Sequence, residues 1–188
     1  FSNNRQIALK GEVWFNVAHD SEHPFQVTSG DSKVKVLGTT FNLNAYPDEK
    51  FLELVVEEGK VEFSTRGLSS AVQMKPNERL LLRNSAINII ETDASKYTAW
   101  KEGKLIFRGD SMDEVARRIS RWYNVSVEVV DEELKDYTFR AIFQDDSLEE
   151  VIRYISMTSP IHYRIVDRKQ LDDGTVKKKT VLLYKEQI

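Results

Sequence analysis

The sequence contains no cysteine, so disulfides, thiolate metal sites and a cysteine nucleophile are all excluded. No apolar run approaches the roughly 20 residues needed to cross a bilayer, and no signal peptide opens the chain, which is expected to be soluble as written. The 27 basic residues are balanced by 30 acidic ones, which leaves no basic stripe for a nucleic-acid backbone. Thiol chemistry is therefore excluded, and DNA or RNA binding is disfavoured.

Histidine is scarce, with only three residues. His19 and His23 are four apart, a spacing that would place two metal ligands on one face of a helix. The intervening Asp20, Ser21 and Glu22, followed by a proline, instead predict a turn between strands. A solvated loop is therefore favoured over a metal site, and no metal or cofactor is expected.

Catalytic motifs are also missing: the chain has no Gly-x-Ser-x-Gly elbow, no Gly-x-Gly-x-x-Gly loop and no Gly-Lys-Ser/Thr phosphate cradle. Two pairs of adjacent carboxylates occur, at Glu57–Glu58 and Asp145–Asp146. Neighbouring residues of a strand point to opposite faces, so neither pair converges on a substrate. A hydrolase of unknown type is the least favoured function, and the protein is predicted not to be an enzyme.

Hydrophobic residues make up 40% of the 188 and charged residues 30%, the balance of a globular protein with a core. The first half has strand periodicity: Val13, Phe15 and Val17 alternate with other residues, and turn-forming residues separate similar short runs. We predict an all-β antiparallel domain, a sandwich or a solenoid, over residues 1–92. Residues 93–103 are predicted to be a linker or short helix, and residues 104–188 a second domain.

The second domain contains an internal repeat. Residues 107–120 (FRGDSMDEVARRIS) align with residues 143–156 (FQDDSLEEVIRYIS), an offset of 36, with 8 of 14 positions identical. Each copy starts a helix with a capping box, at Ser111 and Ser147, and continues with apolar residues at helical spacing. We predict two βαβ units that place two helices on one small sheet, an α+β domain. The expected strands are 105–107, 125–129, 139–143, 161–166 and 180–184, the last reached by a hairpin that turns at residues 172–174.

Several blocks of this sequence, in this order, resemble the FecR family of anti-sigma factors in the form common in Bacteroidetes. The most specific is Leu-Gly-Thr followed by Phe-Asn, and two further blocks resemble the junction and first helix end of the family's C-terminal domain. The blocks are Leu9–Val17 (LKGEVWFNV), His23–Val27 (HPFQV), Val34–Tyr46 (VKVLGTTFNLNAY), Glu58–Val61 (EGKV), Lys75–Glu78 (KPNE), Trp100–Phe107 (WKEGKLIF) and Arg121–Tyr123 (RWY).

The resemblance implies a signalling role. The C-terminal domain is similar to the short N-terminal domain of secretins and TonB-dependent receptors. A TonB-dependent outer-membrane receptor would present its periplasmic signalling domain to this chain, and the signal would pass to an extracytoplasmic-function sigma factor. The sigma-binding segment, the single membrane helix and the first β-strands are expected upstream of Phe1, which places this chain at the periplasmic face of the inner membrane.

Sheet edges are the expected contact surface, because an unpaired strand can accept a strand from a partner. We predict edges at 125–129 and 180–184, with partner-binding residues Val125, Val127, Val129, Val181, Leu183 and Tyr184. The alternative function is a carbohydrate-binding or cell-envelope structural module.

That alternative would need an exposed aromatic platform. Packing is favoured for Trp100 and for Trp122, which follows the apolar stripe of its helix. Only Trp14, on the face opposite Val13 and Phe15, remains a candidate surface contact.

Overall fold

The computed structural model describes residues 5–170 and 176–185, and the chain divides into two compact units, Phe1–Lys101 and Glu102–Ile188. The segment expected to link them contains a helical turn, α1 (Ser95–Thr98), and a 3₁₀ turn, η1 (Ala99–Glu102). Most of this segment thus belongs to the first unit, which we call the β unit. The second is the repeat unit.

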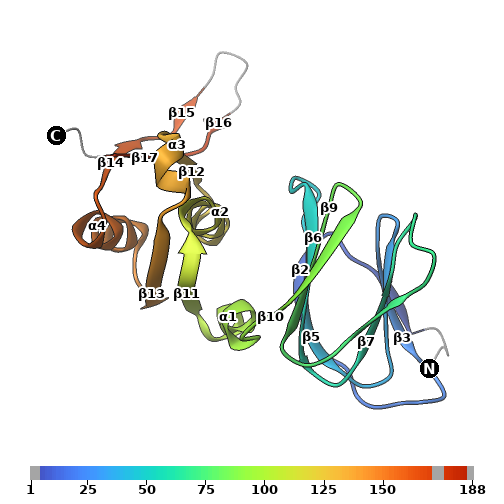
Figure 1. Cartoon of the computed structure of the whole chain (residues 1–188). Coiled ribbons are helices and arrows are strands. Elements are labelled where there is room, and N and C mark those ends of the chain that lie inside the picture. Colours follow the sequence, from blue (N-terminus) through green and yellow to red (C-terminus); the bar gives the residue numbers. More distant parts are fainter. Residues whose placement is uncertain (1–4, 171–175, 186–188) are drawn as a thin grey trace. The chain divides into compact units, whose positions relative to one another are not determined.

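The β unit contains two five-stranded sheets, in the orders β1-β3-β4-β7-β8 and β10-β9-β6-β5-β2 (Figure 1). All pairings are antiparallel except that of β1 with β3, which is parallel and departs from the expected pattern. The strands are β1 Gln6–Ala8, β2 Gly11–Asn16, β3 Phe25–Ser29, β4 Ser32–Val36, β5 Thr40–Ala45, β6 Phe51–Glu58, β7 Val61–Ser64, β8 Val72–Met74, β9 Glu78–Arg83 and β10 Ala86–Glu91.

One apolar core lies between the two sheets. Val27, Val34 and Phe63 come from the first sheet, and Phe41 and Leu54 from the second, all 2% exposed or less. The alternation of β4, buried at every second residue, follows from the period of two along a strand. The β-rich character expected from the sequence is confirmed, and these two sheets form a sandwich.

The Leu-Gly-Thr block forms a tight corner of this sandwich. A Cβ added to Gly38 would lie 2.6 Å from Cα of His19, and one added to Gly59, whose φ is +86°, would lie 2.7 Å from the carbonyl oxygen of Gly38. Thr39 Oγ1 donates to the carbonyl of Lys60 at 2.8 Å, and a bulge follows between Thr40 and the next residue. The Leu-Gly-Thr block and the Glu-Gly-Lys block can therefore pack this closely only because Gly38 and Gly59 have no Cβ.

The outer face of the second sheet is covered by α1 and η1. Val55 on β6 is buried with Ala94 and Tyr97, and Glu53 on the same face is 2% exposed. Arg79 on β9 binds Oε2 of Glu53 through Nε (2.6 Å) and Nη2 (2.5 Å). The polar face of this sheet is thus an interior layer, paired internally as buried charges must be.

The repeat unit follows the expected order of strands and helices. Its strand 161–166 has the predicted bounds, and its other strands overlap theirs. The elements are β11 Lys104–Ser111, α2 Met112–Tyr123, β12 Ser126–Val129, α3 Glu132–Lys135, β13 Thr138–Gln144, α4 Leu148–Thr158, β14 Ile161–Val166, β15 Lys169–Gln170, β16 Val176–Lys177 and β17 Thr180–Lys185. The predicted hairpin turn at 172–174 lies outside the described residues.

The strands of this unit form two main sheets, which corrects the prediction of one. The first strands of the two repeats, β11 and β13, pair with each other, while the second strands, β12 and β14, flank β17 in a three-stranded sheet. A two-residue ladder of β15 and β16 is separate. Each βαβ unit therefore divides its strands between two sheets, and both helices bury their apolar stripes against a core shared by both sheets.

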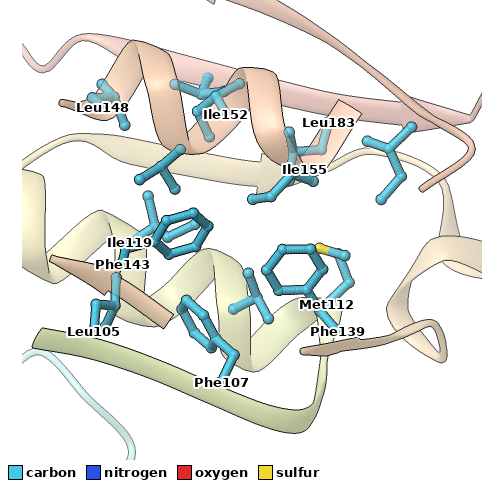
Figure 2. Close-up of a cluster of buried hydrophobic side chains, with 14 of the residues drawn as sticks. Leu105, Phe107, Met112, Ile119, Phe139, Phe143, Leu148, Ile152, Ile155 and Leu183 are labelled. Carbon is cyan, nitrogen blue, oxygen red and sulfur yellow. The ribbon is translucent and has the colours of Figure 1, made fainter. Parts of the chain in front are cut away.

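Figure 2 shows this core, with side chains from β11, β13, α2, α4 and β17 pointing into one cluster. Phe107 and Phe139 meet edge to face with centroids 5.8 Å apart. Ile119 and Ile155, from corresponding helical positions of the two repeats, are both 0% exposed. Each such side chain contributes about 1.5–3 kcal/mol through its burial.

Both helix caps form, but only one is a complete capping box. Ser147 Oγ and the Ser147 N–H donate to Oε2 of Glu150 (2.7 and 2.8 Å), while the Glu150 N–H donates to Ser147 Oγ. Ser111 Oγ accepts from the N–H of Glu114, whose carboxylate binds Arg117 at 2.6 Å. The helix α4 therefore depends more on its cap than α2 does.

We expect Ser147→Ala to lower the free energy of unfolding by about 1 kcal/mol, and Ser111→Ala by less. Hydrogen bonding by the Ser147 side chain, then by its backbone, lowers the pKa of Glu150. This stabilisation is present above the ordinary pKa of glutamate and is lost as the pH falls through the lowered value. Urea unfolding, monitored by amide exchange in α4, measures the free energy of unfolding of wild type and of Ser147→Ala. The difference between the two free energies should become smaller as the pH falls. A difference that does not change with pH would contradict this account.

Within residues 5–170 and 176–185, none of the helices combines the length and apolar character that crossing a membrane requires.

Candidate partner-binding surface

The predicted edge at 180–184 is wrong, because β17 is the central strand of its sheet. It pairs in parallel with β12 and antiparallel with β14, so ladders occupy its backbone groups on both sides. Val181 and Leu183 are 0% exposed core residues, and Tyr184 stacks on His162 with ring centroids 5.9 Å apart. These residues cannot offer a free strand edge.

The strand β12 is an edge of its sheet, but its own chain closes much of it. The N–H groups of Ser126 and Val130 bond toward β17, so the alternation of the ladder turns those of Val127 and Val129 outward. Val127 N–H already donates to Ser120 Oγ at 2.9 Å. Val125, before the strand, is buried and bonds to the Ser120 carbonyl. Ser120 therefore occupies the backbone N–H groups of Val125 and Val127, and the binding role of Val125, Val127 and Val129 stays a prediction.

The sheet of β11 and β13 has two outer edges, and that of β11 is closed by side chains. Asp110 Oδ2 accepts the N–H of Arg108 at 2.8 Å, and Arg118 Nη1 donates to the carbonyl of Ile106 at 2.6 Å. These groups face away from β13, which identifies positions 106 and 108 as the outward-facing ones.

The edge of β13 is open along most of its length. The register pairs Ile106 with Ile142 and Arg108 with Arg140, so Arg140 and Ile142 also turn their N–H and C=O groups outward. At the end of the strand, the Gln144 N–H donates to Oδ2 of Asp146 at 2.9 Å. In the described part of the chain, no side chain bonds to the backbone of Arg140 or Ile142.

A groove of about 450 Å³ is lined by side chains of β13 and α4. Three of its large side chains are exposed: Ile142 by 61%, Tyr154 by 46% and Met157 by 77%. Tyr154 meets Phe143 edge to face with centroids 5.6 Å apart, which ties the wall of the groove to the core. Exposed apolar side chains beside unpaired backbone groups are typical of a surface that binds another chain.

The charged lining of the groove is net negative. Asp146 and Glu150 line it together with Arg153, and the hydrogen bonds of Ser147 keep the pKa of Glu150 low. Nearby, Tyr123 donates to the carbonyl of Asp146 at 2.8 Å, and its pKa is raised, first by burial and then by the carboxylates of Asp146, Glu150 and Glu149. The groove therefore combines exposed apolar side chains with two carboxylates and one guanidinium.

Sequence reasoning missed this groove, although a signal was available. Tyr154 and Met157 are large apolar residues of α4 that fall outside its buried stripe of Leu148, Val151, Ile152 and Ile155. In α2 the stripe continues to Tyr123, so Trp122, predicted to pack, is instead 37% exposed.

The other tryptophans are held within the β unit. Trp14 Nε1 donates to Oε2 of Glu57 at 2.8 Å, and Lys101 Nζ lies 4.1 Å from the centroid of its ring. Trp100 Nε1 donates to Oδ1 of Asn42 at 3.0 Å. The Trp14 ring is thus covered by a lysine rather than presented as an open platform.

The histidine turn forms an internal cluster. His23 Nδ1 lies 3.1 Å from Oδ2 of Asp20, and hydrogen bonds from the backbone of His23 are the main cause of the lowered pKa of Asp20. His19 lines a separate cavity of about 590 Å³ over the Gly38 corner, together with Lys35 and Glu62, which are 3.9 Å apart. Across the described ranges, no three His, Asp or Glu side chains are grouped as a metal site would require.

Comparison with known proteins agrees with the blocks found in the sequence. Residues 1–62 match the family described as FecR protein, and residues 104–171 match FecR, C-terminal. No curated protein matches the chain.

Two crystal structures from Parabacteroides distasonis ATCC 8503, each assigned to an anti-sigma factor, are similar over nearly the whole chain. The first, at 1.65 Å resolution, is 30% identical with a TM-score of 0.79, and the match covers 99% of this chain and 82% of that one. The second, at 2.50 Å, is 30% identical with a TM-score of 0.75, covering 97% and 80%. Family membership indicates a regulatory rather than a catalytic protein, and the chain belongs to the FecR family of anti-sigma factors.

Proposed function

We propose that the chain is the periplasmic sensor region of a transmembrane anti-sigma factor. It receives a signal from a TonB-dependent outer-membrane receptor and relays it to an extracytoplasmic-function sigma factor, which a cytoplasmic segment of the same protein would bind. The repeat unit is the receiving part and binds the receptor's periplasmic signalling domain.

One observation carries this proposal. The unit that matches the FecR C-terminal family leaves a strand edge open beside a groove with exposed apolar side chains. A regulator that works by contact needs such a surface, because main-chain hydrogen bonds supply affinity and side-chain pockets supply specificity. That the contact serves as a signal is inferred from membership of the family.

Calorimetric titration of the chain with the purified signalling domain of the receptor encoded beside it tests the proposal. We expect saturable binding, and the same result with residues 102–188 if that unit folds alone. A receptor barrel lacking the signalling domain is the control and should not bind. Absence of binding at high micromolar concentration, together with a clear response to glycans, would instead support the envelope-module alternative.

A further inference from the structure

We infer that the groove between β13 and α4 is a docking site that takes an extended segment of a partner protein as an added strand on β13. This inference rests on the proposed function in that the receptor's signalling domain is the first partner to test. It goes further in naming the edge, the groove and the kind of segment that binds.

The internal repeat provides the main argument, because it places a closed edge and an open edge in equivalent positions. At the offset of 36, Ile106 corresponds to Ile142, and Arg118 corresponds to Tyr154. In the first repeat Arg118 lies over Phe107, 4.9 Å from the ring centroid, and donates to the outward carbonyl of Ile106. In the first repeat, a side chain of the same repeat thus hydrogen-bonds the outward carbonyl of the edge strand.

In the second repeat the arginine is replaced by a tyrosine. Tyr154 keeps the contact with the aromatic ring below it, Phe143, but forms no hydrogen bond to the Ile142 carbonyl. The end of the strand is unchanged, since Asp146 binds Gln144 N–H as Asp110 binds Arg108 N–H. The two repeats therefore differ in one contact: Arg118 hydrogen-bonds the outward carbonyl of Ile106, and Tyr154 makes no such bond to Ile142. Without this bond, the edge of β13 can pair with another strand.

The replacement also makes the open edge apolar. Met157 occupies the position of Arg121, so two arginines of the first repeat become tyrosine and methionine in the second. Met157 is 77% exposed and adaptable in shape, as suits contact with a partner side chain. An extended segment meets both requirements, since its backbone pairs with Ile142 while alternate side chains enter the groove.

The charges of the groove define the segment further. Asp146 follows the last residues of β13 and lines the groove with Glu150, while Arg153, which acts on Glu150, supplies one positive charge against these two negative ones. A lysine or arginine of the bound segment at that end would be complementary, whereas an aspartate or glutamate would be repelled. The occupant is therefore an extended peptide with apolar residues at alternate positions and a basic residue at the end near Asp146.

The strand β14 is a further edge of the repeat unit to compare. It flanks β17 on one side and has no third neighbour in the described part of its sheet. Its exposed apolar residue is Val166, 41% exposed. The groove with large exposed apolar side chains described above lies along β13, so β13 is the favoured edge.

Tyr154→Arg tests the inference with the chain's own chemistry, because it restores the arginine of the first repeat. We expect it to close the edge and weaken binding of the receptor's signalling domain at least about tenfold, since the strand loses a main-chain contact and the groove loses apolar surface. Tyr154→Phe, which leaves the edge open, should bind as wild type does. Val130→Arg, at an exposed site 55% accessible, controls for the added charge.

Hydrogen exchange in the wild-type protein gives a second readout that needs no variant. Strand addition predicts slower exchange of the Ile142 and Arg140 amides on binding, because these N–H groups become paired. A helix lying in the groove would bury Met157 but leave both amides unprotected, which would overturn the inference.

The outcomes separate this inference from the proposed function. If the signalling domain binds but Tyr154→Arg has no effect and Ile142 gains no protection, the inference fails and the proposed function stands. If the domain does not bind, the proposed function fails, and displayed random octapeptides then test the groove itself. Enrichment of alternating apolar peptides with a basic end on wild type but not on Tyr154→Arg supports the inference, and enrichment of none overturns it.

Discussion

Arg79→Met is expected to lower the free energy of unfolding of the β unit by about 3–5 kcal/mol, because it leaves the Glu53 carboxylate buried without a partner. The Glu53 side chain is only 3% exposed, and Nε and Nη2 of Arg79 both reach its Oε2 atom. The guanidinium also lies 5.1 Å from the Tyr97 ring centroid, so the substitution loosens the helical cover as well. Urea unfolding measures the change.

The double variant Glu53→Leu/Arg79→Met distinguishes the cost of an unpaired buried charge from the contribution of the ion pair itself. Removing both charges should restore stability to within about 1 kcal/mol of wild type, because the remaining space is apolar and neither partner is left unpaired. Arg66→Met is the matched control: Arg66 pairs with Asp31 at 3.0 Å but is 82% exposed, so its loss should cost at most about 0.5 kcal/mol. Equal effects of Arg79→Met and Arg66→Met would contradict the account.

The readout must report on one unit at a time, since two units need not unfold together. Trp14 and Trp100 lie in the β unit, whereas Trp122 belongs to the repeat unit and is 37% exposed. A Trp122→Phe background therefore limits tryptophan fluorescence to the β unit at little cost in stability.

Periodicity predicted the elements of both units well. The alternation in β4 and the capping box at Ser147 are local features, fixed by residues a few positions apart, and both appear in the structure. The repeat predicted that α2 and α4 would share one packing pattern, and Ile119 and Ile155 do occupy equivalent places in one core. Features encoded within a few residues are those that a single sequence predicts.

Pairing between strands was not predictable in the same way. Periodicity says which face of a strand is apolar, but not which strand lies beside it. The prediction of one sheet in the repeat unit failed for this reason, and so did the prediction of an edge at β17. A signal for its central place was present, since Val181, Leu182 and Leu183 form a continuous apolar run, which is typical of a strand covered on both sides.

The polar layer of the β unit escaped prediction for a different reason. In β5 and β6 the residues Asn42, Asn44 and Glu53 alternate with apolar ones, a pattern that predicts one solvated face. The structure buries both faces, because α1 and η1 cover the polar one and residues distant in sequence supply the partners. Trp100, 58 residues from Asn42, is one of them.

The open groove illustrates the same limit at the candidate site. The substitution of Tyr154 for the arginine of the first repeat is visible in the aligned repeats, but its meaning depends on Arg118 bonding to a backbone carbonyl of β11. Only the structure shows that bond, and with it the consequence that β13 lacks one. A repeat alignment becomes informative about function when one copy's contacts are known.

Gly38→Ala is expected to destabilise the β unit by about 3 kcal/mol, through a clash with backbone rather than through strain in φ. The added Cβ would lie 2.6 Å from Cα of His19 and 2.8 Å from its Cβ. The backbone around His19 cannot easily move away, because Asp20 N–H bonds to the Leu37 carbonyl at 2.7 Å and Val17 exchanges two hydrogen bonds with Thr39. Fluorescence-detected urea unfolding in the Trp122→Phe background measures the loss.

Gly30→Ala is the matched control, and it separates the two reasons for which glycine is used. Gly30 has φ of +56° with no atom within 4 Å of an added Cβ, so its substitution carries backbone strain without a clash and should cost about 1 kcal/mol. Gly38 has the clash without the strain. If both variants lost the same stability, the close fit of Gly38 against His19 would not be what the Leu-Gly-Thr block provides; a clearly larger loss at Gly38 would make that block a packing signature of the β unit, independent of any binding role.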